Sequence, residues 1–177
     1  MNSDILEVIY TKEQIAKIVE RLAKEVHHDY ADKVPLIVCV LKGAVVFMTD
    51  FVRDYEGQLE MDFMDVSSYN GTESSGEVRI IKDLDASVKD RDVILLEDIV
   101  DTGATLKALT SLFRHRGANS VRIVSLFDKP SGRRVDISAD YFGVTVPDKF
   151  IVGYGLDYNE RYRNLPYIGV LKPEVYS

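Results

Sequence analysis

Acidic and hydroxyl side chains follow an apolar run in the middle of the chain. Residues 93–96 are Val-Ile-Leu-Leu, followed by Glu97, Asp98 and Asp101 and then by the turn Thr102-Gly103-Ala104-Thr105. An apolar run that ends in acids is typical of a buried parallel strand whose carboxyl end reaches the surface, where open α/β sheets bind ligands. The turn precedes helix-like sequence, so its backbone N–H groups, two hydroxyls and helix N-terminus form a candidate phosphate cradle.

Carboxylates next to a phosphate cradle restrict the kind of ligand. They would repel a phosphate unless something lies between them, and a sugar's hydroxyls and a divalent cation both suit that position. The segment therefore predicts a phosphorylated sugar bound together with Mg²⁺.

Two other phosphate-binding motifs do not occur in the chain. An apolar run followed by Glu-Asp also resembles the Mg²⁺-binding strand of P-loop NTPases, but G-x-x-x-x-G-K-[ST], which that class requires, is absent. The dinucleotide fingerprint G-x-G-x-x-G is absent too, because Gly153-Tyr154-Gly155 supplies only its first half. The absence of these motifs excludes P-loop NTPases and dinucleotide-binding proteins of that type.

The composition indicates one globular domain. The 177 residues are enough to bury a proper core. We expect a single domain over residues 1–177, with a core at about 10–130 and a hood largely at about 131–177. The net charge of −7 disfavours a nucleic-acid binder, which carries an excess of Lys and Arg.

The single cysteine indicates the compartment. Cys39 lies in the apolar run 36–41, so we expect a small core residue and not a reactive thiol. One cysteine excludes an internal disulfide framework and fits a reducing cytosol. The first residues show no signal-peptide pattern, and no apolar run approaches membrane-spanning length. We therefore expect a cytoplasmic protein with no membrane partner.

Helical and strand patterns alternate along the chain. Thr11 and Gln14 form a capping box, and apolar residues at helical spacing predict a long helix from there to about Val26. Further predicted elements are helices at 44–55 and 106–116, strands at 36–41, 59–66, 78–81, 91–97, 121–127, 141–146, 150–154 and 168–171, and a polar loop at 67–76. This order predicts an α/β fold: a central, mostly parallel twisted sheet flanked by helices, with a small hood of C-terminal and N-terminal segments.

Four segments together resemble a known family. Residues 97–105 resemble the phosphoribosyl-pyrophosphate motif of the type I phosphoribosyltransferases, and residues 41–43, 68–69 and 147–160 are similar to its 6-oxopurine branch. The resemblance extends from about residue 36 to about residue 171. It implies a Mg²⁺-dependent purine-salvage enzyme that transfers phosphoribose from phosphoribosyl pyrophosphate to N9 of hypoxanthine or guanine.

The resemblance also implies roles for the phosphate and sugar residues. Glu97 and Asp98 would hold the ribose 2′- and 3′-hydroxyls and, directly or through water, Mg²⁺. The residues Thr102, Gly103, Ala104 and Thr105 would hold the 5′-phosphate. Asp101 would act near N7 of the purine as a general base, although the residue type also fits a plain N-cap of the following helix.

Pyrophosphate contacts are implied for Lys42, Gly43 and Arg163. In the family an unusual cis peptide often precedes the glycine, whereas composition alone indicates an ordinary turn after a strand. A planar guanidinium such as that of Arg163 grips a phosphate through two N–H groups. Ser68 and Tyr69 match the family's mobile loop and would form a lid that excludes water.

Purine contacts are implied for residues in the last third of the chain. Lys129 would donate to the 6-oxo group, although a single lysine is by default solvated. Phe150 would stack on the purine plane, although a Phe in a strand is more often a core residue. Ile151 and Asp157 would offer main-chain groups to the purine edge, and the Asp157 side chain a second Mg²⁺ position.

Two rival functions follow from the same residues. A regulator on this fold that senses nucleotides and binds RNA would need a basic face, for which an acidic chain gives little support. A phosphoribosyltransferase for another base is the second rival, and the segment 150–157 argues against pyrimidine and adenine more than against xanthine. We expect small-molecule substrates, no nucleic-acid partner, and the homodimer or homotetramer that is usual in the family.

Overall fold

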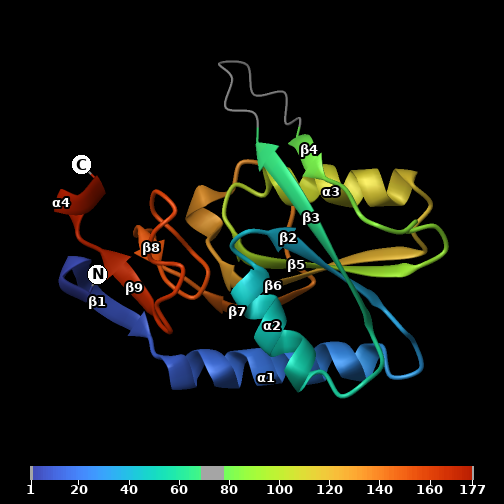
Figure 1. Ribbon diagram of the computed structural model, residues 1–177, viewed down its shortest axis with the longest axis horizontal. Helices are drawn as coiled ribbons and strands as arrows, with labels where there is room; N and C mark the ends of the chain where they lie inside the picture. The colour runs from blue at the N-terminus through green and yellow to red at the C-terminus, as the bar shows by residue number, and fades with distance from the viewer. Residues whose placement is uncertain (1, 69–77, 177) are drawn as a thin grey trace.

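A six-stranded sheet lies at the centre of the computed structural model, which describes residues 2–68 and 78–176 (Figure 1). Its strand order is β4-β3-β2-β5-β6-β7, and every neighbouring pair is parallel except β3 with the edge strand β4. A second sheet has the order β1-β9-β8. The strands are β1 (Ile5–Tyr10), β2 (Leu36–Leu41), β3 (Glu60–Ser68), β4 (Val78–Lys82), β5 (Asp92–Val100), β6 (Ser120–Asp128), β7 (Tyr141–Thr145), β8 (Ile151–Val152) and β9 (Ile168–Leu171). The helices are α1 (Lys12–Asp29), α2 (Val45–Asp54), α3 (Ala104–His115) and α4 (Pro173–Tyr176), with 3₁₀ turns at Asn2–Asp4 and Pro130–Gly132.

Helices cover both faces of the large sheet. Helices α1 and α2 pack on one face, in a core that contains Ile37 of β2 and Ile94 of β5. Helix α3 packs on the opposite face, in a core that contains the next residue of each strand, Val38 and Leu95 (Figure 1). Successive strand residues point to opposite faces, so these nearly continuous apolar strands are buried on both sides. The predicted α/β architecture is confirmed.

Local sequence signals account for individual elements. Thr11 and Gln14 form the predicted capping box at the start of α1, with the Thr11 hydroxyl accepting from the Gln14 N–H at 3.3 Å. Cys39 is fully buried in β2, and burial raises the pKa of its thiol to about 12. It is therefore the inert core residue that its apolar surroundings predict.

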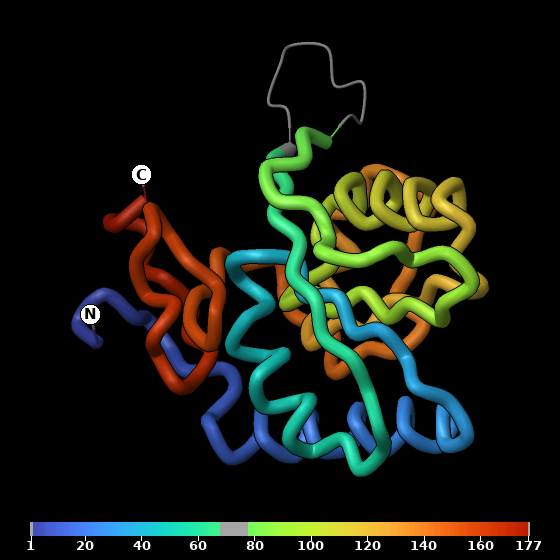
Figure 2. The backbone as a smooth tube through the Cα atoms, turned by 45° about the vertical axis from the view of Figure 1, so that its right-hand side comes forward, coloured from blue at the N-terminus to red at the C-terminus, as the bar shows by residue number. Residues whose placement is uncertain are grey.

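The small sheet joins the two ends of the chain. Strand β1 near the N-terminus pairs antiparallel with β9 near the C-terminus, and β9 pairs with β8, so the blue and red ends of the tube lie side by side in Figure 2. A strand at Ile5–Tyr10 was not predicted. The predicted strand at 141–146 belongs to the large sheet as β7 and not to the hood. Because β7 lies in the large sheet, the boundary between the two sheets does not coincide with residue 131.

Other element boundaries also differ from the prediction. The loop predicted at 67–76 does not include Ser67 and Ser68, which are the last residues of β3 and pair with Arg79 and Val78; residues 69–76 lie outside the described residues. Strand β5 extends to Val100, three residues beyond its predicted end. Backbone pairing with the neighbouring strand β6 continues through these residues and overrides the change to acidic side chains.

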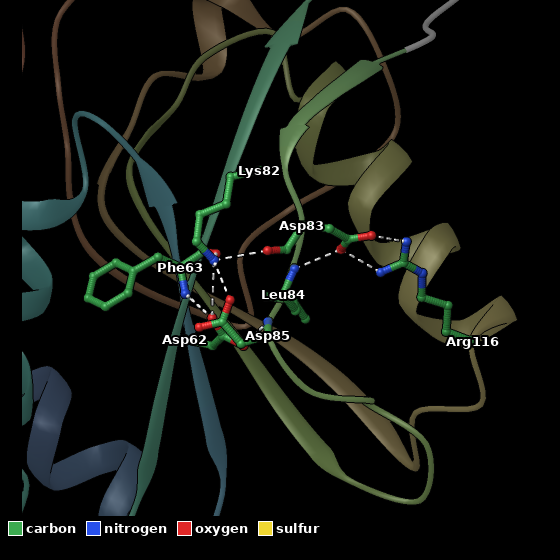
Figure 3. Close-up of polar contacts among 7 residues, drawn as sticks. All are labelled: Asp62, Phe63, Lys82, Asp83, Leu84, Asp85 and Arg116. Atoms are coloured by element: carbon green, nitrogen blue, oxygen red, sulfur yellow. Dashed lines mark hydrogen bonds and ion pairs between the residues drawn. The ribbon is translucent and has the colours of Figure 1, made fainter.

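A polar network fixes the β3–β4 ribbon to the rest of the fold (Figure 3). The buried carboxylate of Asp62 accepts the Asp85 N–H at 2.8 Å and lies 3.7 Å from the Lys82 ammonium. Asp83 accepts two bonds from Arg116, at 2.7 and 2.6 Å, just beyond the C-terminal end of α3. The segment after β4 is thereby attached both to the sheet and to the helix whose other end borders the predicted phosphate cradle.

Candidate active site

Three parallel strands deliver the predicted residues to one edge of the large sheet. Strand β2 leads into Lys42, β5 into Asp101, and β6 into Lys129. These strands are neighbours in the order β2-β5-β6, so the loops at their carboxyl ends lie next to one another. Lys129 also bonds directly to the end of β5, through its N–H and the Val100 carbonyl at 3.0 Å.

The acidic pair Glu97–Asp98 carries the strongest electrostatic perturbation of the site. Asp98 is only 8% exposed and accepts the Ile99 N–H at 2.7 Å. Burial raises the pKa of Asp98 to about 6, partly offset by the Ile99 N–H and the Arg163 charge. Burial, followed by the neighbouring Asp98, raises the pKa of Glu97 well above its usual range. Such costly groups persist where a ligand or a cation uses them.

Close backbone packing brings the turn after β2 against this pair. A Cβ on Gly43 would lie 1.8 Å from Asp98 Oδ2, and a Cβ on Gly155 would lie 2.0 Å from the Gly43 carbonyl oxygen. The Leu41–Lys42 peptide bond is cis. The Lys42–Gly43 turn is therefore held between Asp98 and Gly155, and only glycine fits at either contact.

An ion-pair network continues from this turn to Arg163. The Arg163 guanidinium donates to the Gly155 carbonyl at 2.7 Å and lies 3.0 Å from Asp157 Oδ1 and 3.3 Å from Glu160 Oε1. The other Glu160 oxygen lies 3.1 Å from the Lys42 ammonium. Lys42 and Arg163, both predicted to bind pyrophosphate, thus share one carboxylate. Glu160 was not predicted as a site residue, although it lies within the segment 147–160 that carries the resemblance.

The predicted phosphate cradle lines a pocket at the start of α3. The pocket is formed by Glu97, Ile99, Val100, Asp101, Thr102, Gly103, Thr105 and Leu106. Helix α3 begins at Ala104 with Gly103 as N-cap at φ 81°, and the cap residue contributes no side-chain hydrogen bond. The alternative reading of Asp101 as the N-cap is therefore wrong. Ala104, also predicted for the cradle, does not line the pocket, and its N–H donates to the Thr102 hydroxyl at 3.4 Å.

A second pocket contains the predicted purine residues. It is lined by Ile99, Asp101, Lys129, Lys149, Phe150, Ile151, Leu156 and Asp157. The Lys129 ammonium lies 3.3 Å from Asp148. Phe150 is 37% exposed, so the core alternative does not hold for it. Lys149, which pairs with Glu7 of β1, is a lining residue that was not predicted.

Asp101 and Ile99 belong to both pockets. Asp101 is exposed, and within residues 2–68 and 78–176 no hydrogen-bond donor pairs with its carboxylate. A Cβ on Gly132 would lie 1.6 Å from Asp101 Oδ1, so this glycine leaves the space that the carboxylate occupies. The predicted general base lies where the two pockets meet.

The carboxylates predicted to bind Mg²⁺ fit the ion only together with a substrate. No group of three or more acidic, His or Cys side chains among the described residues could hold a metal. Glu97 Oε2, however, is buried without a hydrogen-bond partner in that part of the chain. Mg²⁺ commonly takes one or two protein carboxylates and completes its shell with phosphate oxygens and water. The pair Glu97–Asp98 suits that use.

Two further predictions concern the lid and the membrane. Ser68 ends β3, and Tyr69 lies outside the described residues, so the predicted lid stays a prediction. No helix in the described ranges is long and apolar enough to cross a membrane.

Comparisons with known proteins show the family of the chain. Residues 6–159 match the family model "Phosphoribosyl transferase domain". The chain is 59% identical to the hypoxanthine-guanine phosphoribosyltransferase of Bacillus subtilis, over 100% of this chain and 99% of that protein. It is 54% identical to the enzyme of the same name from Streptococcus thermophilus, with the same coverage.

A solved structure shows the same fold throughout. It is a hypoxanthine phosphoribosyltransferase from Staphylococcus aureus, 53% identical, with a TM-score of 0.97 over 100% of this chain and 97% of that chain. The match covers both sheets and the loops that bear the site. The chain therefore belongs to the phosphoribosyltransferase family and, within it, to the hypoxanthine-guanine phosphoribosyltransferases.

Proposed function

We propose that the protein transfers 5-phosphoribose from phosphoribosyl pyrophosphate to N9 of hypoxanthine or guanine, giving IMP or GMP and pyrophosphate. One observation carries the proposal: the phosphate-cradle pocket and the purine pocket share Ile99 and the unpaired carboxylate of Asp101. A ribose bound between the two pockets would present C1′ to a purine, as joining two substrates requires.

The cradle and the acidic pair bind the sugar phosphate. The N–H groups at the start of α3 and the hydroxyls of Thr102 and Thr105 hold the 5′-phosphate. Glu97 and Asp98 accept hydrogen bonds from the ribose 2′- and 3′-hydroxyls, which lessens the cost of their burial. The same carboxylates would hold Mg²⁺, which when bound neutralises charge on the pyrophosphate.

The pyrophosphate replaces Glu160 as the ionic partner of Lys42 and Arg163. Lys42 and Arg163 form ion pairs with Glu160, and both are placed to exchange that carboxylate for the phosphate oxygens. The Lys42 and Glu160 side chains are both largely exposed, and such a pair is worth about 0–1 kcal/mol, so exchanging this pair costs little. The contact of Arg163 with the Gly155 carbonyl keeps its guanidinium oriented while its partners change.

Asp101 handles the proton on the purine. As N9 attacks C1′, N7 must lose or share its proton, and a carboxylate at hydrogen-bonding distance takes it as general base. Phe150 stacks on the base, and Lys129 donates to the 6-oxo group. Ile151 and Asp157 offer main-chain groups to the opposite edge, and the Asp157 side chain is the proposed second Mg²⁺ position. Ser68 and Tyr69 belong to the proposed lid.

We also propose the wider setting of the enzyme. The chain acts as one domain, with the three-stranded sheet as a hood over the carboxyl edge of the large sheet. It assembles as a homodimer or homotetramer in the cytoplasm, where free purines and phosphoribosyl pyrophosphate are the partners and nucleic acid is not. The acidic composition supports this last point.

A single assay tests the function. Purified protein is given phosphoribosyl pyrophosphate and Mg²⁺ with hypoxanthine, guanine, xanthine or adenine in turn, and nucleotide formation is followed by absorbance. We expect IMP and GMP at rates far above that for adenine. Nucleotide from adenine alone, or no nucleotide from any purine in a protein that unfolds cooperatively, would refute the proposal. Chelation of divalent ions should stop the reaction.

A further inference from the structure

The C-terminal helix α4 places Tyr176 against the ring of Phe150. The two ring centroids lie 4.9 Å apart and the ring planes meet at 23°, which is a stacked arrangement. Tyr158 meets Phe150 edge-on, with centroids 5.5 Å apart and planes at 89°, and lies 6.5 Å from the Tyr176 centroid. These three residues form one aromatic cluster, in which each ring contacts both others.

Only one ring of the cluster borders the purine pocket. Phe150 lines that pocket, and neither Tyr158 nor Tyr176 does. Tyr176 is stacked on the Phe150 ring and does not line the pocket. An aromatic ring has two faces, so in the inferred arrangement Tyr176 covers one face of Phe150 and the base stacks on the other.

Backbone pairing sets the position of Tyr176 relative to Phe150. Strand β9 pairs with β8, and the Leu171 N–H donates to the Phe150 carbonyl at 2.8 Å. Helix α4 follows directly, with the Val175 N–H donating to the Lys172 carbonyl at 3.0 Å. The Val175 side chain packs against a small core that includes Leu171. The last turn of the chain is thus attached to the strand next to Phe150.

We propose that Tyr176 is a positioning residue for the purine: its ring fixes the orientation of the Phe150 ring and so sets the affinity for the base without touching it. The inference rests on the proposed stacking role of Phe150. The second torsion of a Phe side chain is broad, and a partly exposed ring with a free rear face would be ordered only when the base binds. A ring already held by Tyr176 avoids that ordering cost.

Tyr176→Ala tests the inference, with Tyr176→Phe as its matched control. Aromatic pairs add about 0.5–1.5 kcal/mol beyond burial, which corresponds to an about 2- to 12-fold rise in KM for hypoxanthine in Tyr176→Ala. The turnover number and KM for phosphoribosyl pyrophosphate should change less than about 2-fold. Tyr176→Phe keeps the ring and should keep the wild-type KM for hypoxanthine. Thermal unfolding of each variant reports on the fold.

Phe150→Ala and the double variant distinguish the stacking role of Phe150 from the positioning role of Tyr176. If Phe150→Ala leaves KM for hypoxanthine unchanged, the stacking role of Phe150 fails, and the role of Tyr176 fails with it. If Phe150→Ala raises this KM and Tyr176→Ala does not, only the positioning role is overturned. Tyr176→Ala should add nothing to Phe150→Ala, and an added effect in the double variant would contradict action through Phe150. A uniform loss of turnover and melting temperature in Tyr176→Ala would show a merely structural role and would also overturn the inference.

Discussion

Gly43 lies too close to Asp98 to accept a side chain. In Gly43→Ala the new methyl carbon would lie 1.8 Å from Asp98 Oδ2 and 2.8 Å from its Cγ, where ordinary contacts begin at 3.4 Å. Either the turn or the carboxylate must move, and overpacking of this kind costs about 1–3 kcal/mol. For a chain of this length we expect a melting temperature about 2–12 °C lower. The KM for phosphoribosyl pyrophosphate should rise, because Asp98 is displaced.

A double-mutant cycle with Asp98→Ala isolates this clash. Asp98→Ala removes the two carboxylate oxygens and the carbon that the Gly43→Ala methyl would meet. In the Asp98→Ala background, Gly43→Ala should therefore cost much less free energy of unfolding than in the wild type, as measured by urea titration. The coupling free energy should be of the same size as the single-variant loss. Additive losses would show that the clash with Asp98 is not the reason for glycine at position 43.

Four further predictions concern the site. Thr105→Val should weaken phosphoribosyl pyrophosphate binding in calorimetry by about 1.5–3 kcal/mol, the worth of a hydrogen bond to a charged group; unchanged affinity would remove Thr105 from the cradle. Lys129→Gln should reduce the hypoxanthine-to-adenine rate ratio, because an amide both donates and accepts, and an unaltered ratio would count against the 6-oxo contact. Asp101→Asn should keep the melting temperature and lower turnover by about 10²–10⁴-fold, and a fully active variant would mean that the base lies elsewhere. Burial raises the pKa of Asp98 to about 6, above its unfolded value, so ionisation of Asp98 opposes folding. The free energy of unfolding of the wild type, measured by urea titration relative to Asp98→Asn, should therefore fall as the pH rises from about 4 to about 7. A difference between the two proteins that stays constant with pH would show an exposed carboxylate.

The fold was predictable where a local pattern decides the element. Helix α1 has a capping box and an apolar stripe, and β5 has a continuous apolar run, so both were predicted from their own residues. Strand β1 was not, because its partner β9 lies some 160 residues along the chain and its burial depends on that pairing. Strand β7 was predicted as a strand but assigned to the hood, since a five-residue apolar segment does not indicate which sheet it joins.

The candidate site was predictable where its charged side chains lie at the ends of strands. Glu97, Asp98 and Lys129 each follow or end an apolar run, and adjacent parallel strands bring such residues to one edge. Glu160 and Lys149 were missed because their partners are distant in sequence: the Glu160–Lys42 contact spans 118 residues and the Lys149–Glu7 contact 142. An ion pair over such distances leaves no periodicity or spacing that a single sequence reveals.

The start of α3 shows why a sound local rule failed at this site. Aspartate is among the preferred N-cap residues, and Asp101 lies just before the helix, yet the N-cap is Gly103 in a left-handed conformation. A capping carboxylate would accept the same N–H groups that a 5′-phosphate needs, and its charge would repel the phosphate. With glycine as the cap, no carboxylate occupies the start of α3, where the Ala104 N–H meets only the Thr102 hydroxyl at 3.4 Å, and Asp101 is left unpaired at the boundary with the purine pocket. In the function we propose, the departure from the usual cap therefore serves both substrates at once.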